Sequence, residues 1–145
     1  MKYFAIACCF LGLILVSSYR KNKSDESEAM KQALLNYFDG IKNHDTSKMS
    51  RATTDDIRIY EEGNVWTNDS VFAQMRRLHY SVNFKFDHFK IDVDDMLGHM
   101  SYFEEADFIF NDTSKHNLYY LGSAACKKEK DGWKLCFLHS DKHKI

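Results

Sequence analysis

The chain has 145 residues, enough for one domain with its own hydrophobic core and too few for two. Hydrophobic residues make up 44% of it and charged residues 28%, as in ordinary globular proteins, and the formal net charge is −1. Because no segment carries a basic stripe, we expect no nucleic-acid partner. Aromatic residues are abundant, at 14%, and such side chains can build a core or line an apolar pocket.

The first eighteen residues differ from the rest. Lys2 precedes an apolar run that ends in small side chains at Val16-Ser17-Ser18. A basic start, an apolar middle and a small-residue end predict a secretory signal peptide over residues 1–18, cleaved after Ser18. The protein would then be exported, to the periplasm or outside the cell. Residues 19–25 would form a polar linker, followed by one domain over residues 26–142.

Two alternatives stay open for this segment. Residues 3–19 are nearly as long as a membrane-spanning helix, which needs about 20 residues, so an uncleaved membrane anchor is the second interpretation. The positive charges that follow the apolar run suit an anchor. A lipoprotein modified at Cys8 or Cys9 is the third interpretation, although the apolar run before these cysteines is short for a signal sequence.

Helical patterns cover three segments. Asp25 and Glu28 match a capping box, which predicts a helix over 25–43 whose apolar stripe faces the core. Asp45 or Thr46 can cap a short second helix, and Asn68 or Asp69 a third. The side chains expected to point inward from these helices are Met30, Leu34, Tyr37, Phe38, Ile41, Met49, Ala52, Val71, Phe72 and Met75.

Alternating patterns predict five strands, over residues 55–63, 81–93, 99–110, 117–129 and 132–142. In the second of these the apolar phase changes at Asp87-His88, as a β-bulge would cause. Asp131-Gly132 predicts a hairpin between the last two strands. The order of helices and strands therefore predicts an α+β fold, with the N-terminal helices on one face of a curved antiparallel sheet.

This order, the stretch "ALLNYFDGIKNHDTSKMSRATTDDIRIY" and the final "KDGWKLCFLHS" resemble the nuclear transport factor 2-like superfamily, and most of all its SnoaL-like, ketosteroid-isomerase-like branch. The resemblance covers about residues 26–142 and implies a cone, in which a bent sheet wraps a helix and leaves an apolar pocket at its open end. Members of this superfamily include isomerases, cyclases, dehydratases, binding proteins and oligomerisation modules. The fold alone therefore does not decide the function.

Glu104 is the candidate for acid–base chemistry, because it is the only charge on an otherwise apolar strand face, between Tyr102 and Ala106. A dry carboxyl there would have a raised pKa and could act as a general acid or base. A structural alternative is that Glu104 pairs with Arg58 or lies at the wet mouth of the pocket. The other side chains expected at the pocket are Tyr37, Phe38, Tyr60, Trp66, Tyr102 and Tyr120.

The last strand raises two further questions. His139 shares its parity with Trp133, Leu135 and Phe137, so we expect a structural histidine on an apolar face or at an oligomer contact, and no metal site. Cys126 would oppose Cys136 if the hairpin has a three-residue turn, which would permit a disulfide. With a two-residue turn the register shifts by one residue, and both thiols would stay free.

These patterns favour an exported domain that binds a small apolar or amphipathic molecule, without demonstrated catalysis and without a cofactor. An isomerase, dehydratase or cyclase that uses Glu104 is one alternative. The other is a dimerisation or partner-binding module, such as a homodimer formed through the outer face of the sheet.

Overall fold

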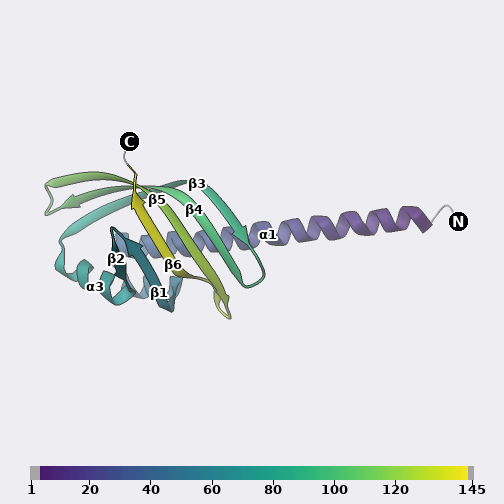
Figure 1. Cartoon of the computed structure of the whole chain (residues 1–145), viewed down its shortest axis with the longest axis horizontal. Helices are drawn as coiled ribbons and strands as arrows, with labels where there is room; N and C mark the ends of the chain where they lie inside the picture. The colour runs from purple at the N-terminus through teal and green to yellow at the C-terminus, as the bar shows by residue number, and fades with distance from the viewer. Residues whose placement is uncertain (1–3, 144–145) are drawn as a thin grey trace.

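The computed structural model describes residues 4–143, with side chains from Lys23 onward. It contains three helices and six strands in this part of the chain (Figure 1). In chain order these are α1 (Phe4–Lys42), α2 (Thr46–Ala52), β1 (Thr53–Glu61), β2 (Asn64–Trp66), α3 (Asn68–Arg77), β3 (Tyr80–Val93), β4 (Leu97–Phe110), β5 (Ser114–Glu129) and β6 (Gly132–Lys142).

The six strands form one sheet in the order β2-β1-β6-β5-β4-β3. It is mixed rather than purely antiparallel, because β1 pairs in parallel with β6, while every other neighbouring pair is antiparallel. The sheet curves around the second half of α1, with α3 at one end (Figure 1). The predicted α+β cone is confirmed, and the short strand β2 is an addition to it.

Helix α1 begins much earlier than the capping box at Asp25 predicts: it starts at Phe4 and continues without a break through Asp25. The polar segment 19–25 is therefore helical, and it contains neither glycine nor proline to end a helix. Glu26, next to the predicted cap, instead reaches the β5–β6 hairpin. Its carboxylate accepts hydrogen bonds from Lys128 Nζ at 2.7 Å and Trp133 Nε1 at 2.5 Å.

The signal-peptide, anchor and lipoprotein interpretations of residues 1–18 concern side chains that lie outside the described part of the chain. Within the part whose side chains are described, residues 23–143, no helix combines the length and apolar character needed to cross a membrane.

The two shorter helices agree closely with their sequence signals. Asp45 caps α2, its carboxylate accepting a bond from Lys48 N at 2.8 Å, and Met49 and Ala52 are buried as predicted. Thr67 caps α3, one residue before the predicted position, together with Ser70. Met75 of α3 is buried against the core.

Long strands β3 and β4 provide the curvature that opens the cone. Their register shifts between Asp87 and Lys90, with His88 at a φ of 52°, so the predicted β-bulge is confirmed. Along β4, alternate side chains from Met100 to Ala106 are buried against the helices, as their parity predicts. The inner face of β4 therefore forms a wall of the core and, further along, of the cavity.

The β5–β6 hairpin has the two-residue turn, because Glu129 pairs with Gly132. The pairing of Cys126 with Cys136 that a disulfide required is wrong: Cys126 pairs with Leu135, and both cysteines are free. A register shift follows at once, since the next pair is Ala125 with Phe137. Cys136 is the extra residue of this bulge.

This second bulge changes the face of every residue after it. His139 does not share the inner face with Trp133, because it is exposed, while Leu138 and Ser140 turn inward. The predicted face that His139 would share with Trp133 and Leu135 is therefore wrong, whereas a contact of His139 in an oligomer stays a prediction. Its neighbour Ser140 instead faces the interior of the cone.

Candidate functional site

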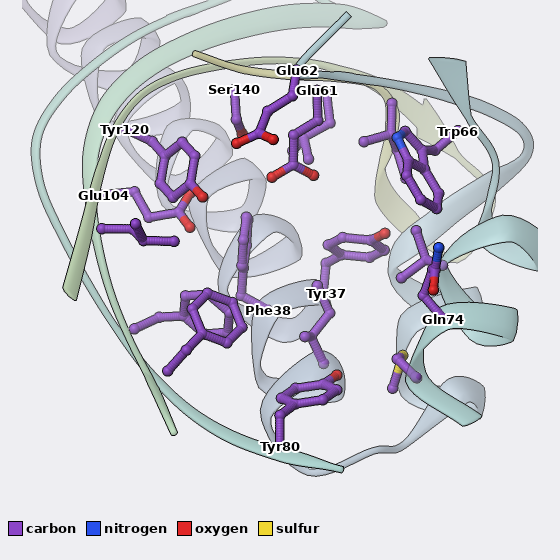
Figure 2. A pocket seen from close by; sticks show the side chains of 18 of the residues that line it. Tyr37, Phe38, Glu61, Glu62, Trp66, Gln74, Tyr80, Glu104, Tyr120 and Ser140 are labelled. Carbon is purple, nitrogen blue, oxygen red and sulfur yellow. The ribbon is translucent and has the colours of Figure 1, made fainter. Parts of the chain in front are cut away.

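A cavity of about 450 Å³ opens between α1, α3 and the concave face of the sheet. Small-molecule sites in proteins typically have volumes of about 300–1,000 Å³ and a mostly apolar lining with few polar groups. The lining here has that character, and its aromatic rings come from helices and strands on all sides (Figure 2). Its apolar part is Tyr37, Phe38, Ile41, Ile59, Trp66, Val71, Met75, Leu78, Tyr80, Phe84, Phe108, Phe110, Leu118, Tyr120 and Leu138.

Glu104 enters this cavity from the middle of β4. Only 5% of the residue is exposed, and its Oε2 has no hydrogen-bond partner among the described residues. Burial, with a smaller contribution from the charge of Glu61, raises the pKa of Glu104 from 4.5 to about 8. A carboxyl in this condition can hold a proton at neutral pH and still release it to a base or a ligand.

Glu61 brings a second carboxyl from the end of β1 (Figure 2). It has the same parity as the buried Ile57 and Ile59, so its side chain points inward with theirs. Burial and the neighbouring charge of Glu62 raise the pKa of Glu61, and Lys142 opposes this effect. The carboxyls of Glu61 and Glu104 therefore face a shared space.

Glu62 lies at the mouth of the cavity because of the tight turn between β1 and β2. Glu62 and Gly63 both have positive φ, at 49° and 77°, as the two central residues of a type I′ hairpin turn require. Lys142, at the end of β6, pairs with the carboxylate of Glu62. This ion pair closes the polar side of the cavity next to Ser140.

Three tyrosines add hydroxyl groups to the lining. Tyr120 stands directly opposite Glu104 across β4 and β5, and Tyr37 and Tyr80 face the cavity from α1 and β3. Burial raises the pKa of each of these phenols, so all three keep their protons at neutral pH. The hydroxyl of Tyr37 is buried without a partner among the described residues, so it can donate to a ligand.

The structural alternative for Glu104, an ion pair with Arg58, does not occur. Arg58 is on the outer face of β1, where its guanidinium donates to the backbone oxygens of Asp56 and Ile57. Nor does Glu104 lie at a wet mouth, since it is almost fully buried. Its carboxyl remains available to whatever enters the cavity.

Two expected pocket residues lie elsewhere. Tyr60 has the outward parity of β1, is 40% exposed, and packs against Phe137 with ring centroids 5.5 Å apart. Tyr102 is buried in the core and is not among the residues that line the cavity. Its ring lies over Gly122 of the neighbouring strand, where any β-carbon would overlap it, and beside Phe86. The structure places Tyr37, Phe38, Trp66, Glu104 and Tyr120 on the cavity wall.

Trp66 reaches the cavity from strand β2 instead of from a loop. The polar residues that sequence reasoning missed are Glu61, Glu62, Asn64, Gln74, Ser140 and Lys142. For Glu61 the signal was present, as it continues the inward row of Ile57 and Ile59. Within the part of the chain that the structure describes, no three His, Cys, Asp or Glu side chains gather as metal ligands would.

The α+β cone, with its curved sheet around α1, is the fold of the nuclear transport factor 2-like superfamily. The sequence profile of the SnoaL-like domain matches residues 30–140, so the chain belongs to the SnoaL-like domain family. No curated protein matches the sequence significantly.

Solved structures support this fold at low sequence identity. The chain is similar to a protein assigned as a dehydratase of the NTF2-like family from Streptomyces avermitilis, with a TM-score of 0.74 at 12% identity over 84% of this chain and 99% of the other. A protein assigned as a scytalone dehydratase from Novosphingobium aromaticivorans superposes with a TM-score of 0.73 at 10% identity, over 86% and 89% of the two chains.

A ketosteroid isomerase-like protein from Erwinia carotovora atroseptica superposes with a TM-score of 0.65 at 13% identity, over 83% of this chain and 98% of the other. At such identities the likeness concerns the fold alone.

Proposed function

We propose that this protein binds a small, predominantly apolar molecule in the cavity of its cone. The observation that carries the proposal is the cavity itself, about 450 Å³ of open space walled by aromatic and aliphatic side chains with a few polar groups on one side. Burying apolar ligand surface there would contribute roughly 25 cal/mol per Å² before the entropic cost of association. The polar groups would then orient the ligand.

Binding of a neutral fluorescent probe, N-phenyl-1-naphthylamine, tests this proposal with the full-length protein. Gln74 lies on the cavity wall on α3, and Arg76 is exposed on the same helix outside the lining. We expect the probe to gain fluorescence with the wild type, to lose most of it with Gln74→Trp, and to keep it with Arg76→Trp. A probe that binds equally well to the Gln74→Trp protein would contradict the proposal.

An acid–base enzyme of isomerase, dehydratase or cyclase type is the second candidate, and Glu104 is the observation that favours it. A general acid or base works best with a pKa near the working pH, and the pKa of Glu104 is about 8. Tyr120, opposite Glu104 across the two strands, could donate a hydrogen bond to a developing oxyanion. Glu104→Gln keeps the shape of the side chain, so turnover of a substrate should collapse while the neutral probe still binds.

A homodimer through the outer face of the sheet is a separate proposal that either role would allow. Phe103 and Leu121 pair across β4 and β5 on that face and are 44% and 42% exposed. Exposed apolar groups in such a cluster are typical of contact surfaces. Sedimentation equilibrium should give a dimer for the wild type and for Met96→Lys in the turn between β3 and β4, and a monomer for Phe103→Lys. A monomeric wild type would exclude the dimer.

The export proposal is independent of the cavity. It depends on the signal-peptide pattern over residues 1–18, which stays a prediction.

A further inference from the structure

The carboxyls in the cavity outnumber the cations that could neutralise them. Glu61, Glu62 and Glu104 all line it, and Lys142 is the only cationic side chain among its described lining residues. Lys142 pairs with Glu62, so neither Glu61 nor Glu104 has an ion-pair partner among the described residues. Glu104 is also 95% buried with an unpartnered oxygen directed at the cavity (Figure 2).

We propose that the cavity selects molecules that carry a protonated amine on an apolar body, with the ammonium group seated between Glu61 and Glu104. This inference rests on the proposed binding function and specifies its ligand class. An ammonium group would supply the counter-charge that these two carboxyls lack. Anionic ligands are disfavoured, since the described lining contains no arginine and its lysine is already paired.

The aromatic lining suits the same ligand class. The rings of Tyr37, Trp66 and Tyr120 border the space that the carboxyls face, and aromatic faces attract cations, most strongly at desolvated sites. Phe84, Phe108 and Leu138 line the same cavity and offer an apolar surface for the body of the molecule. One end of the ligand would thus be charged and the rest apolar.

Proton release is a specific consequence of this arrangement. Tyr120 on β5 pairs with Glu104, Glu61 on β1 and Tyr37 on α1 line the same cavity, and the buried Tyr102 lies two residues away on β4. The phenols keep their protons at neutral pH, so only the carboxyls can respond to a bound cation. An ammonium group favours the ionised form of Glu104, so the protein should release a proton into solution when the amine binds near pH 7.

Three probes with one body and three charges test the inference: 4-phenylbutylamine, 4-phenylbutanol and 4-phenylbutyrate, titrated calorimetrically into the full-length protein at pH 7. We expect the amine to bind at least tenfold more tightly than the alcohol, and the carboxylate to bind most weakly. Titration in two buffers of different ionisation enthalpy should report proton release for the amine alone. The number of protons released should be smaller at pH 9, where Glu104 is already mostly ionised.

Glu61→Gln should reduce the preference for the amine over the alcohol to less than threefold. Glu105→Gln is the matched control, because Glu105 is next to Glu104 but on the outer face, paired with Lys85. Equal binding of amine and alcohol, or an unchanged preference in Glu61→Gln, would overturn the inference while the binding function stands. If N-phenyl-1-naphthylamine binds but 4-phenylbutylamine does not, the inference is also overturned. If none of the probes binds, both proposals are wrong.

Discussion

Replacing Glu104 by glutamine should stabilise the fold, and the gain should depend on pH in a defined way. In the folded protein the pKa of Glu104 is about 8, whereas in the unfolded chain it returns to about 4.5. Below pH 4.5 the carboxyl is protonated in both states, so its ionisation does not change the free energy of unfolding. As the pH rises from 4.5 to 8 the unfolded state loses this proton first, so the free energy of unfolding falls, and above pH 8 the loss is complete.

The size of this effect follows from the difference between the two pKa values. Each pKa unit corresponds to 1.36 kcal/mol, so the upper limit of the loss is on the order of 5 kcal/mol. Protein interiors relax around a new charge and respond as a medium more polar than a dry interior, so we expect a measured difference of about 2–3 kcal/mol. This is a large fraction of the 5–15 kcal/mol that is typical of a domain.

Urea unfolding of the wild type and Glu104→Gln, followed by tryptophan fluorescence from pH 4 to pH 9, measures the effect. When the free energies of unfolding of the two proteins are subtracted, the contributions of all titrating groups that they share cancel. It should be near zero at pH 4, rise between pH 5 and pH 8, and level off above. Glu105→Gln is the control, because hydrogen bonds from Asn117 and Lys85 lower the pKa of Glu105, so its removal should not stabilise the fold. A difference that does not change with pH would refute the reasoning.

Three further predictions concern other parts of the chain. Gly122→Ala should destabilise the fold by about 1–3 kcal/mol in urea unfolding, because its β-carbon would overlap the ring of Tyr102; a neutral effect would contradict this packing. Glu26→Gln should cost about 1 kcal/mol above pH 4.5, and progressively less as the pH falls through the pKa of Glu26, which bonds from Lys128 and Trp133 lower; a loss that persists in strong acid would exclude this cause. N-terminal sequencing of the native protein should begin near Tyr19, whereas a membrane-bound chain that keeps residues 1–18 would favour the anchor.

The sequence was sufficient for the cone and for much of its inner wall. Period-two parity placed Glu104 inside β4, and helical periodicity placed Tyr37 and Phe38 on the inner side of α1, because both patterns depend only on local geometry. The same parity rule, applied to β1, would also have placed Glu61 on the inner face. Tyr60 is on the opposite parity and for that reason could have been excluded.

The other differences between the predicted and the observed structure come from features that no residue type in the sequence indicates. The bulge at Cys136 turns Ser140 inward and His139 outward, yet no glycine or asparagine marks it. Tyr102 has the predicted inward parity but does not line the cavity. Its ring lies over Gly122 on the neighbouring strand, and such a contact between two strands cannot be read from parity. The long first helix passes through Asp25 because the polar segment before it forms helix just as well.

A crystal structure of the full-length protein grown with 4-phenylbutylamine would test the central claim most directly. The account predicts the phenyl ring among the aromatic side chains of the cavity, with the ammonium nitrogen within hydrogen-bonding distance of the carboxylates of Glu61 and Glu104. A cavity that stays free of the amine, or an amine bound only on the outer face of the sheet, would contradict the claim.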